Sequence, residues 1–128
     1  MPRTVADYAT AHNIDDSLLA FTVGGRQTAA FELHLPKDVD AGSRSVLAFM
    51  VHTTDADDLH FTVEVNGKQA QTYTVNSEVL RGIHEIIGPD VLRDGDQARS
   101  GNHVDFKLTS GDGTLRIGDV VLWFQRRD

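Results

Sequence analysis

The fold class is indicated by residues 100–124, which read SGNHVDFKLTSGDGTLRIGDVVLWF. In the first half of this stretch apolar residues alternate with polar ones, as is typical of a strand with one buried face. The segment 110–113, Ser-Gly-Asp-Gly, contains two glycines, which readily take the positive φ of a hairpin loop. Pairing outward from this loop predicts a β-hairpin with its apolar residues on one face. The predicted pairs are Thr109–Thr114, Leu108–Leu115 and Phe106–Ile117.

The rest of the chain consists of short alternating segments separated by turn residues. Further strands are expected, and Asn66-Gly67 between two of them is a strong hairpin signal. Thr4 to Ala11 is expected to form a short helix, because Thr4 can cap it and apolar residues recur at helical spacing. The sequence therefore predicts a single all-β domain over residues 1–128, an antiparallel β-sandwich that is jelly-roll-like, with a short N-terminal helix. The further strands span residues 14–23, 28–35, 46–51, 59–65, 68–75 and 79–87.

The composition limits the classes of partner. The chain has 128 residues, a formal net charge of −7 and no cysteine. Because lysine and arginine do not cluster, binding to nucleic acid or to an anionic membrane is not expected. No apolar run is long enough to span a bilayer. The start, Met1 to Thr4, leads into no apolar segment, so no secretory signal is predicted and the cytoplasm is the default location, although a trimmed chain would look the same.

Several short motifs occur in order in the last third of the chain. A leucine and a glycine precede an asparagine at the start of an alternating strand, and the last strand carries an acidic residue. In these motifs the C-terminal third resembles galactose-binding-like jelly rolls and related carbohydrate-binding modules. The resemblance implies a jelly-roll fold and non-catalytic binding of carbohydrate. The motifs are Val91-Leu92, Asp94-Gly95, the run from Gly101 to Phe106 and the run from Gly113 to Leu122.

The predicted ligand site is a polar face of the two strands that flank Asn66-Gly67. This turn sets a register in which polar and aromatic side chains share one face. A ring that stacks on a sugar, beside amides, carboxylates and hydroxyls that bond its rim, is a mixture that binds carbohydrate. An ordinary solvated face and a face covered by a partner chain are the alternatives. The predicted pairs are His60–Tyr73, Thr62–Gln71 and Glu64–Gln69.

Asp119 breaks the alternation of the last strand. It shares the parity of Ile117 and Val121, so strict alternation would bury its carboxylate. A buried carboxylate needs a partner, and a bound cation is one such partner. A bulge at Gly118 would instead turn Asp119 away from the core. Both interpretations are open at this point.

A second acidic group lies in the loop before the last strands. Asp94 and Asp96 precede Asn102, and oxygen ligands at alternate positions suit calcium. Calcium held by Asp119, or by the loop of Asp94 and Asp96, is therefore a hypothesis, and solubilising loops are the alternative for the latter. The six histidines form no pair at the spacing of a zinc site, so a histidine-based metal site is not expected.

Two segments, 46–51 and 120–124, are apolar on both strand faces. Trp123 shares the parity of Val121 and is expected in the core. The other face would then need cover from the N-terminal helix or from another subunit. This favours a second hypothesis, a structural or assembly subunit that forms a homo-oligomer or joins a partner protein through its sheet faces. No Gly-x-Ser-x-Gly elbow occurs, and an enzyme is not predicted.

Overall fold

The computed structural model describes residues 4–12, 19–22, 27–99 and 101–127. Within these residues the chain forms seven β-strands and one short 3-10 helix, and no helix is long and apolar enough to cross a membrane. The elements are β1 Thr4–His12, β2 Leu19–Thr22, β3 Thr28–Leu33, β4 Ser45–Val65, β5 Lys68–Val75, β6 Val79–Ile87, η1 Gly95–Arg99 and β7 Asn102–Arg127.

Two long strands, β4 and β7, form the centre of the structure. They pair antiparallel along nearly their whole length, from Val46–Trp123 at one end to Val65–Val104 at the other. Every other strand pairs with one of these two. The alternation of buried and partly exposed residues continues along both strands on either side of a bend.

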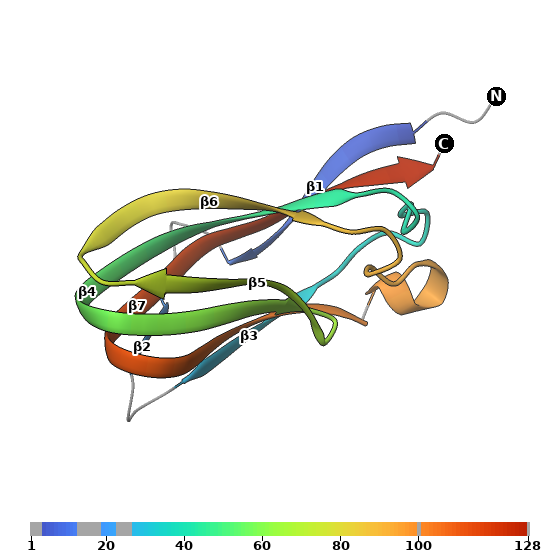
Figure 1. Ribbon diagram of the computed structural model, residues 1–128. Helices are drawn as coiled ribbons and strands as arrows, with labels where there is room; N and C mark the ends of the chain where they lie inside the picture. The colour runs from blue at the N-terminus through green and yellow to red at the C-terminus, as the bar shows by residue number, and fades with distance from the viewer. Residues whose placement is uncertain (1–3, 13–18, 23–26, 100, 128) are drawn as a thin grey trace.

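Both long strands bend at the same place (Figure 1). In β4 the bend contains Asp55 and Asp58, whose φ angles are 53° and 51°. In β7 it contains Gly111 and Gly113, whose φ angles are 91° and 130°. Aspartate tolerates the left-handed region better than most side chains, and glycine enters it without steric cost. The bend therefore lies where the sequence offers residues that can make it.

The bend divides the sheet into two layers that face each other (Figure 1). In the first layer, residues 114–127 of β7 pair with β1 and β2 on one side and with residues 46–54 of β4 on the other. The far edge of this layer is β6, which pairs with β4. In the second layer, residues 102–110 of β7 lie between β3 and residues 59–65 of β4, and β5 forms the far edge. All these pairings are antiparallel.

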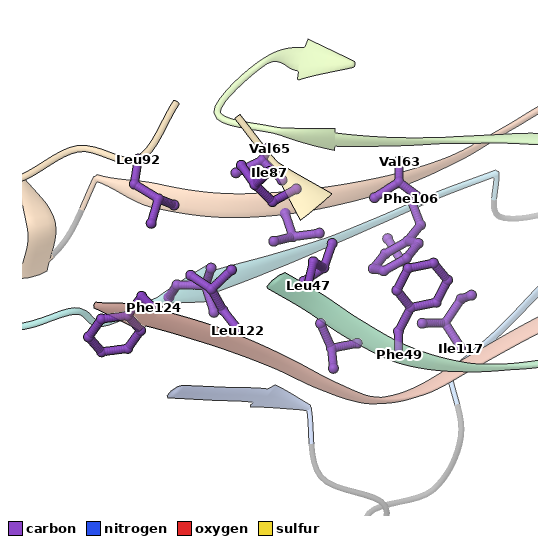
Figure 2. Packing of buried hydrophobic residues seen from close by; sticks show 14 of the residues in the cluster. Leu47, Phe49, Val63, Val65, Ile87, Leu92, Phe106, Ile117, Leu122 and Phe124 are labelled. Carbon is purple, nitrogen blue, oxygen red and sulfur yellow. The ribbon is translucent and has the colours of Figure 1, made fainter. Parts of the chain in front are cut away.

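The core fills the space between the two layers. Phe49 of the first layer meets Phe106 of the second, with ring centroids 5.0 Å apart at 74° (Figure 2). Leu47, Val63 and Ile117 are fully buried beside them. Burying such a side chain stabilises a fold by roughly 1.5–3 kcal/mol, so these inward rows hold the two layers together.

The predicted hairpin at residues 110–113 is wrong. The strand residues on either side of this segment pair with β4 and belong to one continuous strand: Leu108 lies opposite Phe61, and Leu115 lies opposite Thr53. The inward side chains were nevertheless assigned to the correct face, since Phe106, Leu108, Leu115 and Ile117 are buried. Alternation shows which side chains of a strand point inward, but it does not show which strand lies beside it. A hairpin and a single strand that bends over the core therefore give the same pattern.

The predicted N-terminal helix is also wrong. The segment from Thr4 to Ala11 lies within β1, which pairs with the edge of β7 from Thr4–Arg127 to His12–Val120. Four of its eight residues are threonine, valine or tyrosine, which favour strands. A segment this short has little helical stability of its own, and the open edge of β7 offers it a full ladder of hydrogen bonds.

Replacing Gly111 by alanine is expected to lower the free energy of unfolding by about 3 kcal/mol or more. The added Cβ would lie 2.0 Å from the carbonyl oxygen of Asp58 and 2.7 Å from the Cα of Leu59, so the backbone of the bend would have to move. Urea unfolding measures the loss.

Gly82→Ala in β6 is the matched control for this prediction. No atom lies within 4 Å of the Cβ that would be added there. The expected change in the free energy of unfolding is under about 0.5 kcal/mol. Similar losses in the two variants would contradict the role given to the close approach at Gly111.

Candidate functional site

The predicted register of β4 and β5 holds only next to the turn. Asn66 and Gly67 both have positive φ, at 52° and 79°, as the predicted turn requires. Val65 pairs with Lys68, and Glu64 pairs with Gln69. Beyond these pairs Ala70 is passed over, so the pairs continue as Val63–Gln71, Thr62–Thr72 and Phe61–Tyr73. Successive side chains of a strand point to opposite faces, so one extra residue reverses the face of every side chain that follows it. The bulge at Ala70 therefore moves Gln71 and Tyr73 off the face of the predicted site.

Tyr73 lies on the core side of β5. Its ring stacks on Phe61, with centroids 4.8 Å apart at 22°, and meets the edge of Phe49. Its hydroxyl donates a hydrogen bond to Glu85 of β6. Burial raises the pKa of the Tyr73 hydroxyl, and the hydrogen bond to the Glu85 carboxylate raises it further. Tyr73 therefore connects the edge strands of the two layers, and the polar face lacks the ring that was assigned to it.

Three of the remaining polar side chains of this face, His60, Thr62 and Glu64, bind neighbouring side chains. The Nζ of Lys107 lies 2.7 Å from Glu64, whose carboxylate accepts its hydrogen bond and raises the pKa of Lys107. Thr62 and Thr72 are 3.2 Å apart through their hydroxyls. His60 and Thr74 also form a hydrogen bond of 2.8 Å. Gln69 is exposed beside Glu64. This face is a flat array of paired side chains, and its role as a ligand site remains a prediction.

The predicted bulge near Gly118 is confirmed. Asp119 has a φ of 50°, and the register between β4 and β7 shifts between the pairs Ala48–Val121 and Met50–Gly118. The bulge brings Asp119 to the outer face of the first layer, where it lines a surface hollow with Trp123. The bulge thus keeps the carboxylate out of the core. A metal role for Asp119 remains a prediction.

The acidic loop is organised by an amide and not by its carboxylates. Asn102 is fully buried, accepts hydrogen bonds from Asn66 Nδ2 and from the backbone N–H of Arg93 (2.8 Å each), and donates to the carbonyl of Arg93 (2.9 Å). Asp96 forms an ion pair with Lys37 at 2.8 Å, and Asp94 is exposed. Within the described residues no group of three metal-ligating side chains occurs. Calcium binding remains a prediction.

The exposed apolar side chains gather on the other outer face, that of the first layer. The large hydrophobic residues that are exposed in the described part of the chain all lie there: Tyr8 (58%), Leu80 (68%), Ile86 (67%) and Trp123 (49%). The placement of Trp123 in the core is therefore wrong. Its neighbours Leu122 and Phe124 are buried instead. The extra residue of the bulge at Asp119 switches the inward side chains of β7 from odd-numbered to even-numbered positions.

A row of apolar side chains crosses this face, and we call it the apolar ridge. Tyr8 pairs with Trp123, Trp123 with Val46, and Val46 with Ile86, so the ridge spans four neighbouring strands. The rings of Tyr8 and Trp123 are 5.1 Å apart and tilted by 43°. The sequence pattern does not identify Tyr8, because it predicts a helix for that segment. It does not identify Trp123, because strict alternation continued past Asp119 takes no account of the extra residue in the bulge.

Two hollows lie on either side of the apolar ridge along the strands, and Trp123 lines both. The Asp119 hollow has a volume of about 240 Å³ and is lined by Asp119, Val121, Met50 and His84 among others. The Gln125 hollow has a volume of about 160 Å³, with Arg44 and Gln125 among its lining residues. Carboxylate, imidazole, amide and guanidinium groups thus flank a central aromatic surface.

A larger cleft of about 480 Å³ lies between β1 and the segment after β3, next to Arg126. Arg126 donates to both carboxylate oxygens of Asp38 at 2.9 and 3.1 Å and to Asp7 at 3.2 Å. Its guanidinium is therefore engaged by two carboxylates. This arrangement fastens the last strand to β1 and to the loop before β4, so the cleft is a weaker candidate for ligand binding than the apolar ridge.

The pKa of Asp38 is expected to lie below its ordinary value, because Arg126 hydrogen-bonds to the carboxylate and attracts its charge. The stability from this pair is present above the unfolded pKa of about 3.9 and is lost as pH falls through the lower folded value. An NMR titration of the side-chain carboxyls measures the shift. Arg126→Gln should raise the pKa of Asp38.

Asp40 is the internal control for this titration. Its pKa is also lowered, first by the hydroxyl of Ser43 and then by Arg127. Arg126→Gln should therefore leave the Asp40 midpoint in place. A parallel rise at Asp38 and Asp40 would indicate a general loss of structure instead.

Solved structures resemble this fold at low sequence identity. Dimeric latent PorU from Porphyromonas gingivalis has a TM-score of 0.67 and 7% identity, with 98% of this chain and 13% of that chain covered. A β-porphyranase of glycoside hydrolase family 86 from the human gut bacterium Bacteroides plebeius has a TM-score of 0.63 and 13% identity, with 98% and 21% covered. The present chain thus spans only a small part of either protein. These likenesses show the fold alone.

A carbohydrate-binding module is also among the structural neighbours. A family 35 module from Clostridium thermocellum has a TM-score of 0.42 and 13% identity, with 91% of this chain and 97% of that chain covered. A likeness at this TM-score carries no argument about function. No family model matches the sequence, and no curated protein matches it.

Proposed function

We propose that this chain is a jelly-roll β-sandwich that binds carbohydrate without catalysing a reaction, and that it does so on the outer face of the first layer. The strand orders support the fold: β2, β7, β4 and β6 in one layer, and β3, β7, β4 and β5 in the other. These eight strand segments in two layers have the arrangement of a jelly roll, and β1 is an additional segment that continues the edge formed by β2. Lectin domains use this architecture, and the solved β-porphyranase contains a region of similar fold.

The observation that carries the proposal is the exposed pair of rings at Tyr8 and Trp123. Contiguous exposed apolar surface is typical of interaction sites, and the apolar C–H face of a sugar ring can cover such a tilted aromatic pair. Hydrogen-bonding groups adjoin the rings at His84, Asp119 and Gln125. A sugar needs both kinds of contact, since each ring carries hydroxyls around an apolar face.

Ile86 and Leu80 favour a second candidate function. They extend the apolar surface onto β6, away from the aromatic pair, and are both about two-thirds exposed. A protein partner or a second copy of the chain would cover them, which is the assembly role inferred from the doubly apolar strands. The hydrogen-bonding groups beside Trp123 favour the sugar over this candidate.

Trp123→Ala is expected to weaken carbohydrate binding about tenfold, because one aromatic contact contributes up to about 1.5 kcal/mol beyond its area. Native gel electrophoresis through porphyran, agarose, xylan and mixed-linkage glucan measures retardation of the chain. Tyr8→Ala should have a smaller effect in the same direction. Because Trp123 is half exposed, its variant should keep the fold and the melting temperature within a few degrees.

Thr72→Ala is the matched control, since Thr72 lies on the outer face of the second layer. It should leave retardation unchanged. Equal losses in Trp123→Ala and Thr72→Ala would contradict the assignment of the site. A chain that no polysaccharide retards, and that forms dimers by light scattering, would favour the assembly function instead.

A further inference from the structure

The order of apolar and polar surface along β7 restricts the ligand that this face can take. The Asp119 hollow, Trp123 and the Gln125 hollow follow one another along the same strand. The stretch from Asp119 to Gln125 spans about 17 Å at the rise of an antiparallel strand, since the extra residue of the bulge adds no full step. One sugar ring over Trp123 would reach neither hollow in full.

The described part of the chain leaves the apolar ridge open to solvent. Trp123 is 49% exposed, and Tyr8 and Ile86 at the two sides are more exposed still. Both hollows are lined by side chains of the sheet face itself and of strand ends, from β1, β4, β6 and β7. None of the described residues closes either hollow, so a ligand can enter it and continue beyond it, and no wall formed by these residues selects a chain end.

The two hollows offer different hydrogen-bonding groups. Asp119 and His84 lie in one, where the carboxylate can accept bonds from sugar hydroxyls. Gln125 and Arg44 lie in the other, where the amide donates and accepts and the guanidinium donates. A ligand that stacks an apolar ring face on Trp123 and carries hydroxyl groups on both sides of that contact would match this order of polar and apolar surface. A protein partner would need an apolar patch of the same narrow shape, bordered by polar groups on both sides.

We infer that the site takes the interior of an extended polysaccharide, bound along β7 with one sugar unit stacked on Trp123 and its neighbours over the two hollows. This inference rests on the proposed carbohydrate binding and specifies its ligand class: a chain of linked sugars, not a free sugar or a chain end. Trp123 and Tyr8 provide the stacking surface. Asp119 and Gln125 provide specificity on opposite sides of it.

The test is calorimetry with agaro-oligosaccharides and xylo-oligosaccharides of increasing length, from the disaccharide to the octasaccharide, together with the parent polysaccharides. The dissociation constant is expected to fall about tenfold or more between the disaccharide and the hexasaccharide and then to level off, as contacts in both hollows are gained. The hexasaccharide should bind equally well with either end chemically blocked.

Variants in the hollows separate specificity from folding. Asp119→Asn, which keeps a residue tolerant of positive φ, and Gln125→Ala should each weaken hexasaccharide binding about three- to tenfold. Neither should change disaccharide binding more than about twofold, because a disaccharide stacked on Trp123 fills only one hollow and can use the one that the variant leaves intact. A merely structural role would weaken both ligands together, and Thr72→Ala should change neither.

Two other outcomes would overturn this inference. Equal dissociation constants for the disaccharide and the hexasaccharide, both raised by Trp123→Ala, would define a single-sugar site and leave the proposed function in place. Loss of binding when one end of the hexasaccharide is blocked would indicate a site for chain ends. Absence of binding to every oligosaccharide and polysaccharide would overturn both the inference and the proposed function.

Discussion

The shared bend of β4 and β7 is the constraint on which the structure depends. At this point the backbone of β7 approaches β4 so closely that a side chain at Gly111 would overlap the carbonyl of Asp58. The bend converts one long antiparallel ladder into two facing layers, and it sets which residues of both strands point inward. The contact of Phe49 with Phe106 follows from it.

A second irregularity gives the outer face its character. The bulge at Asp119 changes the parity of β7 within the first layer, so Leu122 and Phe124 fill the core while Trp123 faces outward. Tyr8 then reaches Trp123 only because the first segment of the chain extends the sheet as β1. The polar side chains of the opposite face are engaged with one another, as at Glu64 and Lys107. The two faces of the molecule therefore differ in chemistry although both are strand surfaces.

The sequence was informative about faces and much less so about partners. Alternation assigned Phe106, Leu115 and their neighbours to the core correctly, and Asn66-Gly67 indicated a real turn. The bulge at Ala70 has no signal in its own residues, so Tyr73 was placed on the wrong face. The pairing of residues far apart along the chain is also invisible to local pattern, because burial of an inward row is satisfied by any strand that covers it.

The two central strands also determine when the molecule can form. Val46 pairs with Trp123 near the end of the chain, and β1, β2 and β3 have β7 as their sheet partner. Such long-range pairing requires large loops to close, and the entropy lost on closure opposes folding until the strand contacts have formed. Folding is slow for this reason. During synthesis the first strands would leave the ribosome with no edge to join. A chain of this design completes its sheet only after β7 has been synthesised, and its early strands depend on remaining unaggregated until then.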